Sequence, residues 1–274
     1  MIAILTLLLT TYGTGDVLPP KDTECFDQTF CIETLERDGT ITLEASLLVS
    51  WDITMSVHLE LVNLRSTESM PLVRTVSADR KAPLVELQVD NPDEPWSYSF
   101  NFSWVTGSAT AVHAASVTYA LPFERGTSWL VGQGYNGQAT HRGKYALDWA
   151  MPEGTAVRAA RGGMVVSVEA DFRTGGLDDE LKGQANHVSI QHDDGTIGTY
   201  VHLRHGGVEV EEGMHVREGD LLGWSGGTGY ASGPHLHFEV YTVNDDLTRT
   251  TIPVEFRTRG RSAEMLIEGR TYGH

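Results

Sequence analysis

Residues 233–240 read GPHLHFEV. Polar and apolar residues alternate along it, and a period of two is typical of a β-strand with one buried face. His235 and His237 therefore lie on one face, opposite the apolar residues. An ordinary strand with a polar outer face is the simple alternative. Two histidines side by side, directly after a glycine-rich turn, favour a functional site instead.

A second segment with this alternation surrounds Asp148. Residues 145–150 read YALDWA, in which bulky side chains alternate with small ones. We expect Tyr145, Leu147 and Trp149 to form a buried face. Asp148 then lies on the opposite face between two alanines, which leave room for an ion or a ligand.

A third segment, residues 199–203, reads TYVHL. We expect Val201 and Leu203 to face the core of a strand. His202 then lies on the other face, beside Tyr200. Taken alone, such a histidine is more often a surface residue than a functional one.

Histidines are concentrated in this part of the chain, because eight of the 11 fall within residues 141–237. Two histidines and an aspartate with further histidines nearby are typical of a zinc site, which has three protein ligands and an open position for water. Zinc is therefore the expected cofactor. We expect four other histidines to be structural or solvated, namely His187, His192, His205 and His215.

The first part of the chain has a strand pattern without such residues. From residue 41 to 61 every odd position is apolar, and the run is too long for one ordinary strand, so it should bend or turn inside. Residues 97–104 alternate in the same way. The pattern predicts an all-β chain with an N-terminal β-sandwich over residues 22–120. Its remaining strands are expected near residues 72–76, 84–89 and 112–120.

Composition excludes several classes of protein. The chain has 274 residues, of which 40% are hydrophobic and 21% charged, as in folded globular proteins. Its net charge of −17 argues against a nucleic-acid partner and against docking on anionic lipid, because both need clustered lysine and arginine.

The N-terminal residues resemble an export signal. Residues 2–9 form an apolar run that is too short to span a bilayer, and we interpret residues 1–16 as a signal peptide, with a buried first strand as the alternative. Cys25 and Cys31 follow closely, and such a pair suits a disulfide in an oxidising compartment. We expect an exported protein, periplasmic or extracellular, without stable membrane insertion after signal cleavage.

Three blocks of the sequence resemble the M23 family of zinc metallopeptidases, the lysostaphin-like cell-wall endopeptidases. The blocks are HRGKYALDWAMPEGTAVRAARGGMVVSV, NHVSIQHDDGTIGTYVHL and VREGDLLGWSGGTGYASGPHLHFEV. They occur in the family order within residues 130–242. The resemblance implies that residues 121–274 form a two-sheet antiparallel β peptidase core with a groove over the metal.

The resemblance also implies roles for single residues. His141, Asp148 and His237 match the metal ligands, and His202 and His235 match the two catalytic histidines that do not bind zinc. The sequence departs from the compact HxxxD motif of the family, because six residues (142–147) separate His141 from Asp148. We interpret the difference as a longer loop. One further candidate, a possible oxyanion helper by position in some relatives, is Tyr135.

The function implied is hydrolysis of stem or cross-bridge peptides of bacterial peptidoglycan by zinc-activated water. The sequence does not assign the role of general base to His202 or to His235. A catalytically inactive M23-like activator or cell-wall binding module is the alternative, and such proteins lack ligands, whereas all five positions are filled here. Parts of the sequence also resemble biotinyl- and lipoyl-type carrier domains, but no lysine stands at the hairpin tip where a carrier is modified.

Overall fold

The computed structural model describes residues 3–7, 23–37, 39–78 and 81–274. Strands and turns make up these residues, together with one short 3₁₀ turn, η1 (Asp179–Leu181), which confirms the predicted all-β class. The chain divides into two compact units, and each is described by itself. Unit 1 comprises Met1–Thr110 and Val243–Thr248, and unit 2 comprises Ala111–Thr242 and Arg249–His274.

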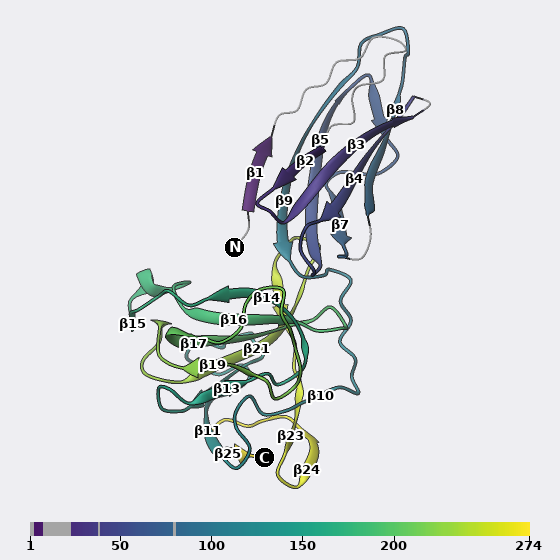
Figure 1. The fold of residues 1–274 in the computed structure, drawn as a ribbon. Coiled ribbons are helices and arrows are strands. Elements are labelled where there is room, and N and C mark those ends of the chain that lie inside the picture. The colour runs from purple at the N-terminus through teal and green to yellow at the C-terminus, as the bar shows by residue number, and fades with distance from the viewer. Residues whose placement is uncertain (1–2, 8–22, 38, 79–80) are drawn as a thin grey trace. The chain divides into compact units, whose positions relative to one another are not determined.

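Unit 1 contains two antiparallel sheets (Figure 1). Their strand orders are β1-β9-β5-β7 and β2-β3-β4-β8-β6. Apolar side chains from both sheets form one core, as in a sandwich, and Leu43 and Phe102 belong to it. The strands are β1 (Ala3–Leu7), β2 (Thr23–Phe26), β3 (Phe30–Arg37), β4 (Thr40–Leu47), β5 (Ile53–Val62), β6 (Leu64–Ser66), β7 (Leu72–Val76), β8 (Ala82–Val89) and β9 (Ser97–Thr106).

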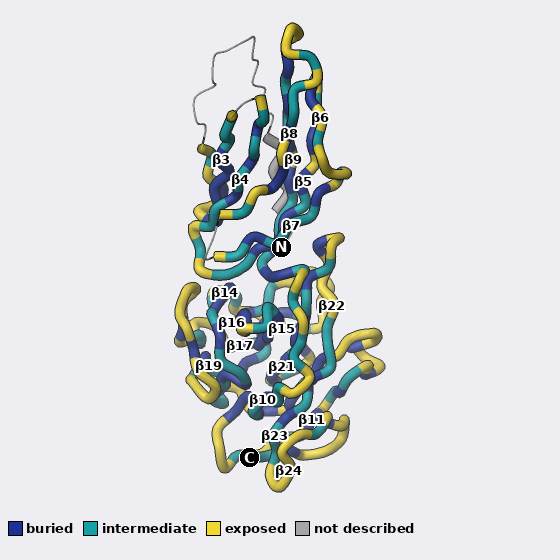
Figure 2. The backbone as a smooth tube through the Cα atoms, turned by 90° about the vertical axis from the view of Figure 1, so that its right-hand side faces the viewer, coloured by how far each residue is buried: buried dark blue, intermediate teal, exposed yellow. Residues whose placement is uncertain are grey.

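The long alternating run of residues 41–61 bends as predicted. It divides into β4 in one sheet and β5 in the other, with a bend at residues 48–52 between them. Buried and more exposed residues alternate along β4 and along β9 (Figure 2). Alternating apolar residues in these strands therefore form the inner faces of both sheets.

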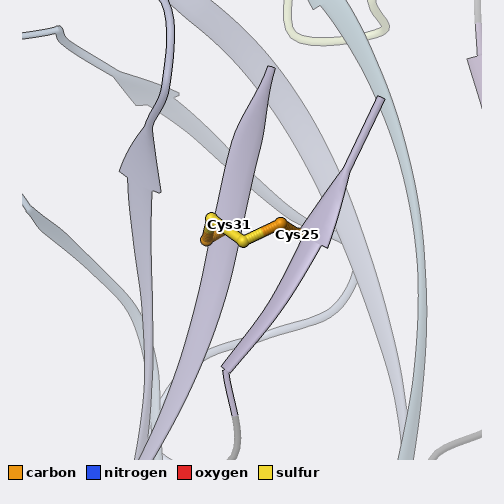
Figure 3. Close-up of a disulfide and its surroundings, with 2 residues drawn as sticks. All are labelled: Cys25 and Cys31. Atoms are coloured by element: carbon orange, nitrogen blue, oxygen red, sulfur yellow. A yellow bond between two sulfur atoms is a disulfide. The ribbon is translucent and has the colours of Figure 1, made fainter. Parts of the chain in front are cut away.

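The cysteines of unit 1 form the predicted disulfide. Cys25 on β2 lies directly opposite Cys31 on β3, and the two are bonded (Figure 3). The predicted signal peptide, residues 1–16, falls largely outside the described residues. Its described part is β1, which pairs with β9 and so agrees with the alternative of a first strand. In the described part of the chain no helix is long and apolar enough to cross a membrane.

Unit 2 is built on a large antiparallel sheet with the order β18-β14-β16-β17-β21-β12-β11-β25, to which β13, β19 and β22 attach (Figure 1). Its core contains Trp149, Tyr200 and Phe238. Smaller sheets are formed by β10-β23-β24 and by β15-β20. The strands are β10 (Thr118–Tyr119), β11 (Ser128–Gln133), β12 (Ala146–Ala150), β13 (Ala156–Arg158), β14 (Gly163–Glu169), β15 (Gly175–Gly176), β16 (Asn186–Gln191), β17 (Ile197–Val208), β18 (His215–Val216), β19 (Leu221–Ser225), β20 (Gly229–Tyr230), β21 (Leu236–Val243), β22 (Arg249–Thr251), β23 (Glu255–Thr258), β24 (Arg261–Glu264) and β25 (Thr271–Gly273).

The predicted sandwich strand near residues 112–120 was wrong. Its strand part is Thr118–Tyr119, which pairs with β23 in unit 2. The residues before it bond to Asp194. The backbone N–H of Val112 donates to the Asp194 carbonyl oxygen, and the backbone N–H of Ala114 donates to the Asp194 carboxylate. These bonds use donors that a strand would give to a neighbouring strand.

Candidate metal centre

Three adjacent strands carry Asp148, His202 and His237. β21 lies between β17 and β12 in the large sheet, and its register places His237 opposite Asp148 on β12 and opposite Val201 on β17. The apolar residues Leu236 and Phe238 are buried on the other face of β21, as predicted. Residues far apart in the sequence therefore meet through strand pairing.

His141, Asp148 and His237 lie close together. Oδ1 of Asp148 is 2.9 Å from Nδ1 of His237, and Oδ2 is 3.3 Å from Nε2 of His141. One possible ligand atom from each residue lies within 4.8 Å of the other two. Two imidazoles and a carboxylate at this spacing can hold a divalent cation such as zinc.

A backbone carbonyl oxygen determines which ring nitrogen of His141 carries a proton. This residue is 1% exposed, and its Nδ1 lies 3.1 Å from the carbonyl oxygen of Gly134. A carbonyl oxygen only accepts, so Nδ1 carries a proton, and in the neutral form of the ring Nε2 has the lone pair. Among the described residues, no well-aligned hydrogen-bond partner reaches this buried Nε2. An orphaned nitrogen beside Asp148 fits a metal ligand.

His237 lies between two carboxylates. Its Nδ1 contacts Asp148, and its Nε2 is 3.5 Å from Oε2 of Glu239. Burial alone would lower the pKa of His237, but the two carboxylates raise it to about 9. Burial would likewise raise the pKa of Asp148, but contacts with His141 and His237 hold it well below its ordinary value. The carboxylate is therefore ionised, as a metal ligand must be.

His202 and His235 lie beside the three possible ligands. Their ring centroids are 4.4 Å apart, and the ring of His202 is 6.0 Å from that of His237. Nδ1 of His202 donates to the carbonyl oxygen of Thr228 at 2.7 Å, and Nδ1 of His235 donates to that of Gly233 at 2.9 Å. In the neutral form of each ring Nε2 is then the acceptor. Burial, followed by the charge of His235, lowers the pKa of His202 to about 4.

Strand β17 does not alternate as predicted. Tyr200 and Leu203 are both fully buried, whereas Val201 is half-buried. The cause is His202, whose φ of 66° lies in the left-handed region and interrupts the period of two. The expectation that Tyr200 lies beside His202 was therefore wrong, and Tyr200 instead accepts a hydrogen bond from the backbone N–H of Ala160 inside the core.

Two tyrosines near the site depart from the expected pattern. Tyr145 is not part of the buried face, because β12 begins after it. Its side chain is exposed, and its ring contacts the ring of Tyr135. The hydroxyl of Tyr135 donates to the carbonyl oxygen of Val254 and accepts from its N–H. Burial raises the pKa of Tyr135. These contacts give Tyr135 a structural role, and its role as an oxyanion helper stays a prediction.

The sequence reasoning missed two polar residues of the site. Glu239 follows His237 by two positions, so the period of two could have placed it on the same face. Gln133, the last residue of β11, donates from Nε2 to Oδ2 of Asp148 at 2.9 Å. No motif points to Gln133, and the contact depends on the pairing of β11 with β12.

The fold and the site define an all-β protein in which two histidines and an aspartate that could hold a cation lie close together. Residues 142–249 match the model of peptidase family M23, so this part of the chain is similar to that family. The match begins directly after His141.

Several known proteins are similar to this part of the chain. Glycyl-glycine endopeptidase ALE-1 of Staphylococcus capitis is 36% identical over 113 residues, which cover 41% of this chain and 28% of that protein. Peptidoglycan DD-endopeptidase ShyA of Vibrio cholerae is 36% identical over 102 residues, which cover 37% of this chain and 20% of that protein. The chain thus spans less than a third of the length of these curated relatives. The solved catalytic domain of lysostaphin from Staphylococcus simulans is 28% identical with a TM-score of 0.33, over 45% of this chain and 87% of that chain.

Proposed function

We propose that the protein is an exported zinc-dependent metalloendopeptidase that hydrolyses stem or cross-bridge peptides of bacterial peptidoglycan. The observation that carries the proposal is the convergence of His141, Asp148 and His237 beside two further imidazoles. The names of two relatives, a glycyl-glycine endopeptidase and a peptidoglycan DD-endopeptidase, support the substrate class.

The ligands would be Nε2 of His141, the carboxylate of Asp148 and Nδ1 of His237. A bound zinc ion supplies Lewis-acid chemistry, which brings the pKa of a water molecule toward about 7 and polarises a peptide carbonyl. Glu239 would keep the remaining proton of His237 on Nε2 and orient the ring. The carbonyl oxygen of Gly134 would likewise keep the remaining proton of His141 on Nδ1 and orient that ring.

His202 and His235 would carry out the proton transfers. Each ring is oriented by a carbonyl oxygen on Nδ1, so Nε2 of one ring can accept the proton of the attacking water. The other ring, when protonated, can donate from Nε2 to the oxyanion that develops on the peptide carbonyl. Because its pKa is lowered, the ring of His202 is neutral at pH 7, which leaves Nε2 free to accept a proton.

Metal analysis and product analysis together test the proposal. We expect one zinc ion per purified chain and new free amino termini on stem or bridge peptides after digestion of sacculi. Chelator-treated protein serves as the inactive control. New reducing sugar ends without new amino termini would contradict the proposal and indicate a glycan hydrolase. A zinc-loaded chain that releases no product but stimulates another hydrolase would support the activator alternative.

A further inference from the structure

The first two predicted ligands along the chain, His141 and Asp148, lie in different kinds of structure. Asp148 lies within β12, whereas His141 lies in the irregular segment of residues 134–145 between β11 and β12. Six residues (142–147) separate them, so local geometry along the chain does not fix the distance between their side chains. A spacing suitable for a metal ion therefore requires a contact that joins the segment to the strand.

Gln133 makes that contact with both ends of its side-chain amide. Its Oε1 accepts from the backbone N–H groups of Ala139 and Thr140, at 3.1 and 3.0 Å. Its Nε2 donates to Oδ2 of Asp148 at 2.9 Å and to Oγ1 of Thr140 at 2.7 Å. The amide oxygen thus holds the segment directly before His141, and the amide nitrogen holds Asp148.

The surrounding backbone leaves space for this side chain. Gly137 lies against it, and a Cβ at position 137 would stand 2.4 Å from Cγ of Gln133, which is too close for two carbon atoms. Gln133 itself is the last residue of β11, and β11 pairs with β12 so that Gln133 lies opposite Asp148. The side chain is therefore anchored in the sheet and reaches out to the segment.

We propose that Gln133 is a positioning residue that holds His141 and Asp148 at the spacing of a metal site. This inference rests on the proposed function, because it takes both residues as zinc ligands. Oδ2 of Asp148 faces His141, and the amide donor on Oδ2 fixes the rotation of the carboxylate. Groups that orient metal ligands in this way typically contribute about 10–100-fold to metal affinity.

Cobalt binding to the full chain tests the proposal without reference to activity. Each protein is stripped with a chelator and titrated with Co²⁺, and the visible absorption of the bound ion reports affinity and ligand geometry. We expect Gln133→Ala and the similarly sized Gln133→Met to weaken binding about 10–100-fold. Gln88→Ala and Gln88→Met are matched controls, because Gln88 lies on β8 in unit 1 and bonds Arg65. Circular dichroism checks that each variant is folded.

Hydrogen exchange of the metal-free proteins tests the contact itself. We expect the backbone amides of Ala139 and Thr140 to exchange faster in both Gln133 variants, because their acceptor is lost. Faster exchange together with unchanged cobalt affinity would give Gln133 a purely structural role and overturn the inference, while the proposed function would stand. Failure of the wild-type chain to bind cobalt or zinc would overturn the proposed function, and the inference with it.

Discussion

His202 and His235 carry the same arrangement of protons, since each ring donates from Nδ1 to a backbone carbonyl oxygen. Neither is needed for a site with three protein ligands. We therefore expect His202→Ala and His235→Ala each to keep bound zinc and to lose about 10²–10⁴-fold in turnover, the usual contribution of general acid–base catalysis. Metal content and hydrolysis of a soluble peptide are measured on the same samples. Loss of zinc in either variant would make that residue a ligand.

His237 differs from these two residues because both of its ring nitrogens face carboxylates. Removing the ring leaves only His141 and Asp148 of the three possible ligands. We expect His237→Ala to lose zinc almost completely, as measured by mass spectrometry of the metal in dialysed protein. His215→Ala is the matched control, because His215 is exposed on β18. Full zinc occupancy in His237→Ala would reject the ligand assignment.

At the scale of elements, the short pair β15-β20 supports the segment that orients His202. A Cβ on Gly175 of β15 would stand 1.6 Å from the carbonyl oxygen of Gly227, next to the Thr228 carbonyl that accepts from His202. We expect Gly175→Ala to displace this segment and to lower turnover by about 10²-fold, as small misplacements of catalytic groups do, with zinc retained.

The control for this variant is the neighbouring glycine. A Cβ on Gly176 would meet Cδ1 of Leu181 at 3.5 Å, an ordinary contact, so Gly176→Ala should behave as wild type. Initial rates at saturating substrate measure the difference. Equal rates for the two variants would show that the close approach at Gly175 has no bearing on catalysis.

The elements also explain what could be predicted from the sequence. The faces of β21 and the burial of Leu147 and Trp149 followed from a period of two, because burial in a regular strand depends on local alternation. The left-handed backbone of His202 has no such local pattern, so the face of Tyr200 was wrong. Gln133 was missed because its partners are set by the folding of an irregular segment, which no short motif encodes.

At the scale of the whole molecule, a buried histidine outside the candidate metal site makes stability depend on pH. His192 is 3% exposed, its Nδ1 donates to the carbonyl oxygen of Gly162, and its ring lies against Tyr119. Burial lowers its pKa to about 4, and the positive charge of Arg161 lowers it while Asp193 and Asp194 raise it. The ring is therefore neutral in the folded protein at pH 7.

The sign of the effect follows from proton uptake. Below about pH 6.5 the unfolded chain takes up a proton on His192, whereas the folded chain does so near pH 4. The free energy of unfolding should thus fall by about 3 kcal/mol across this window through His192. We expect His192→Gln, which does not titrate, to be less dependent on pH there, with His58→Gln at an exposed position as the matched control.

Unit 2 has to be measured by itself in this experiment. Denaturant titrations of the chelated protein at each pH, read from peptides of β16 by pulsed hydrogen exchange and mass spectrometry, give its unfolding free energy. Identical pH dependence in wild type and His192→Gln would contradict the prediction. Burial would raise the pKa of Asp194, but Thr196 and Arg161 lower it. The carboxylate is therefore protonated only below this pH window, so its titration does not affect the comparison.

The central place of β21 in the large sheet sets the order in which the candidate site can form. β21 separates β17 from β12, and Asp148 and His237 are 89 positions apart in the chain. Pairings between such distant segments form slowly, because a long loop must close first. A chain still being synthesised therefore has no complete site until β21 has emerged and inserted between its two neighbours. Metal capture at this site would therefore report that β21 has inserted into the sheet.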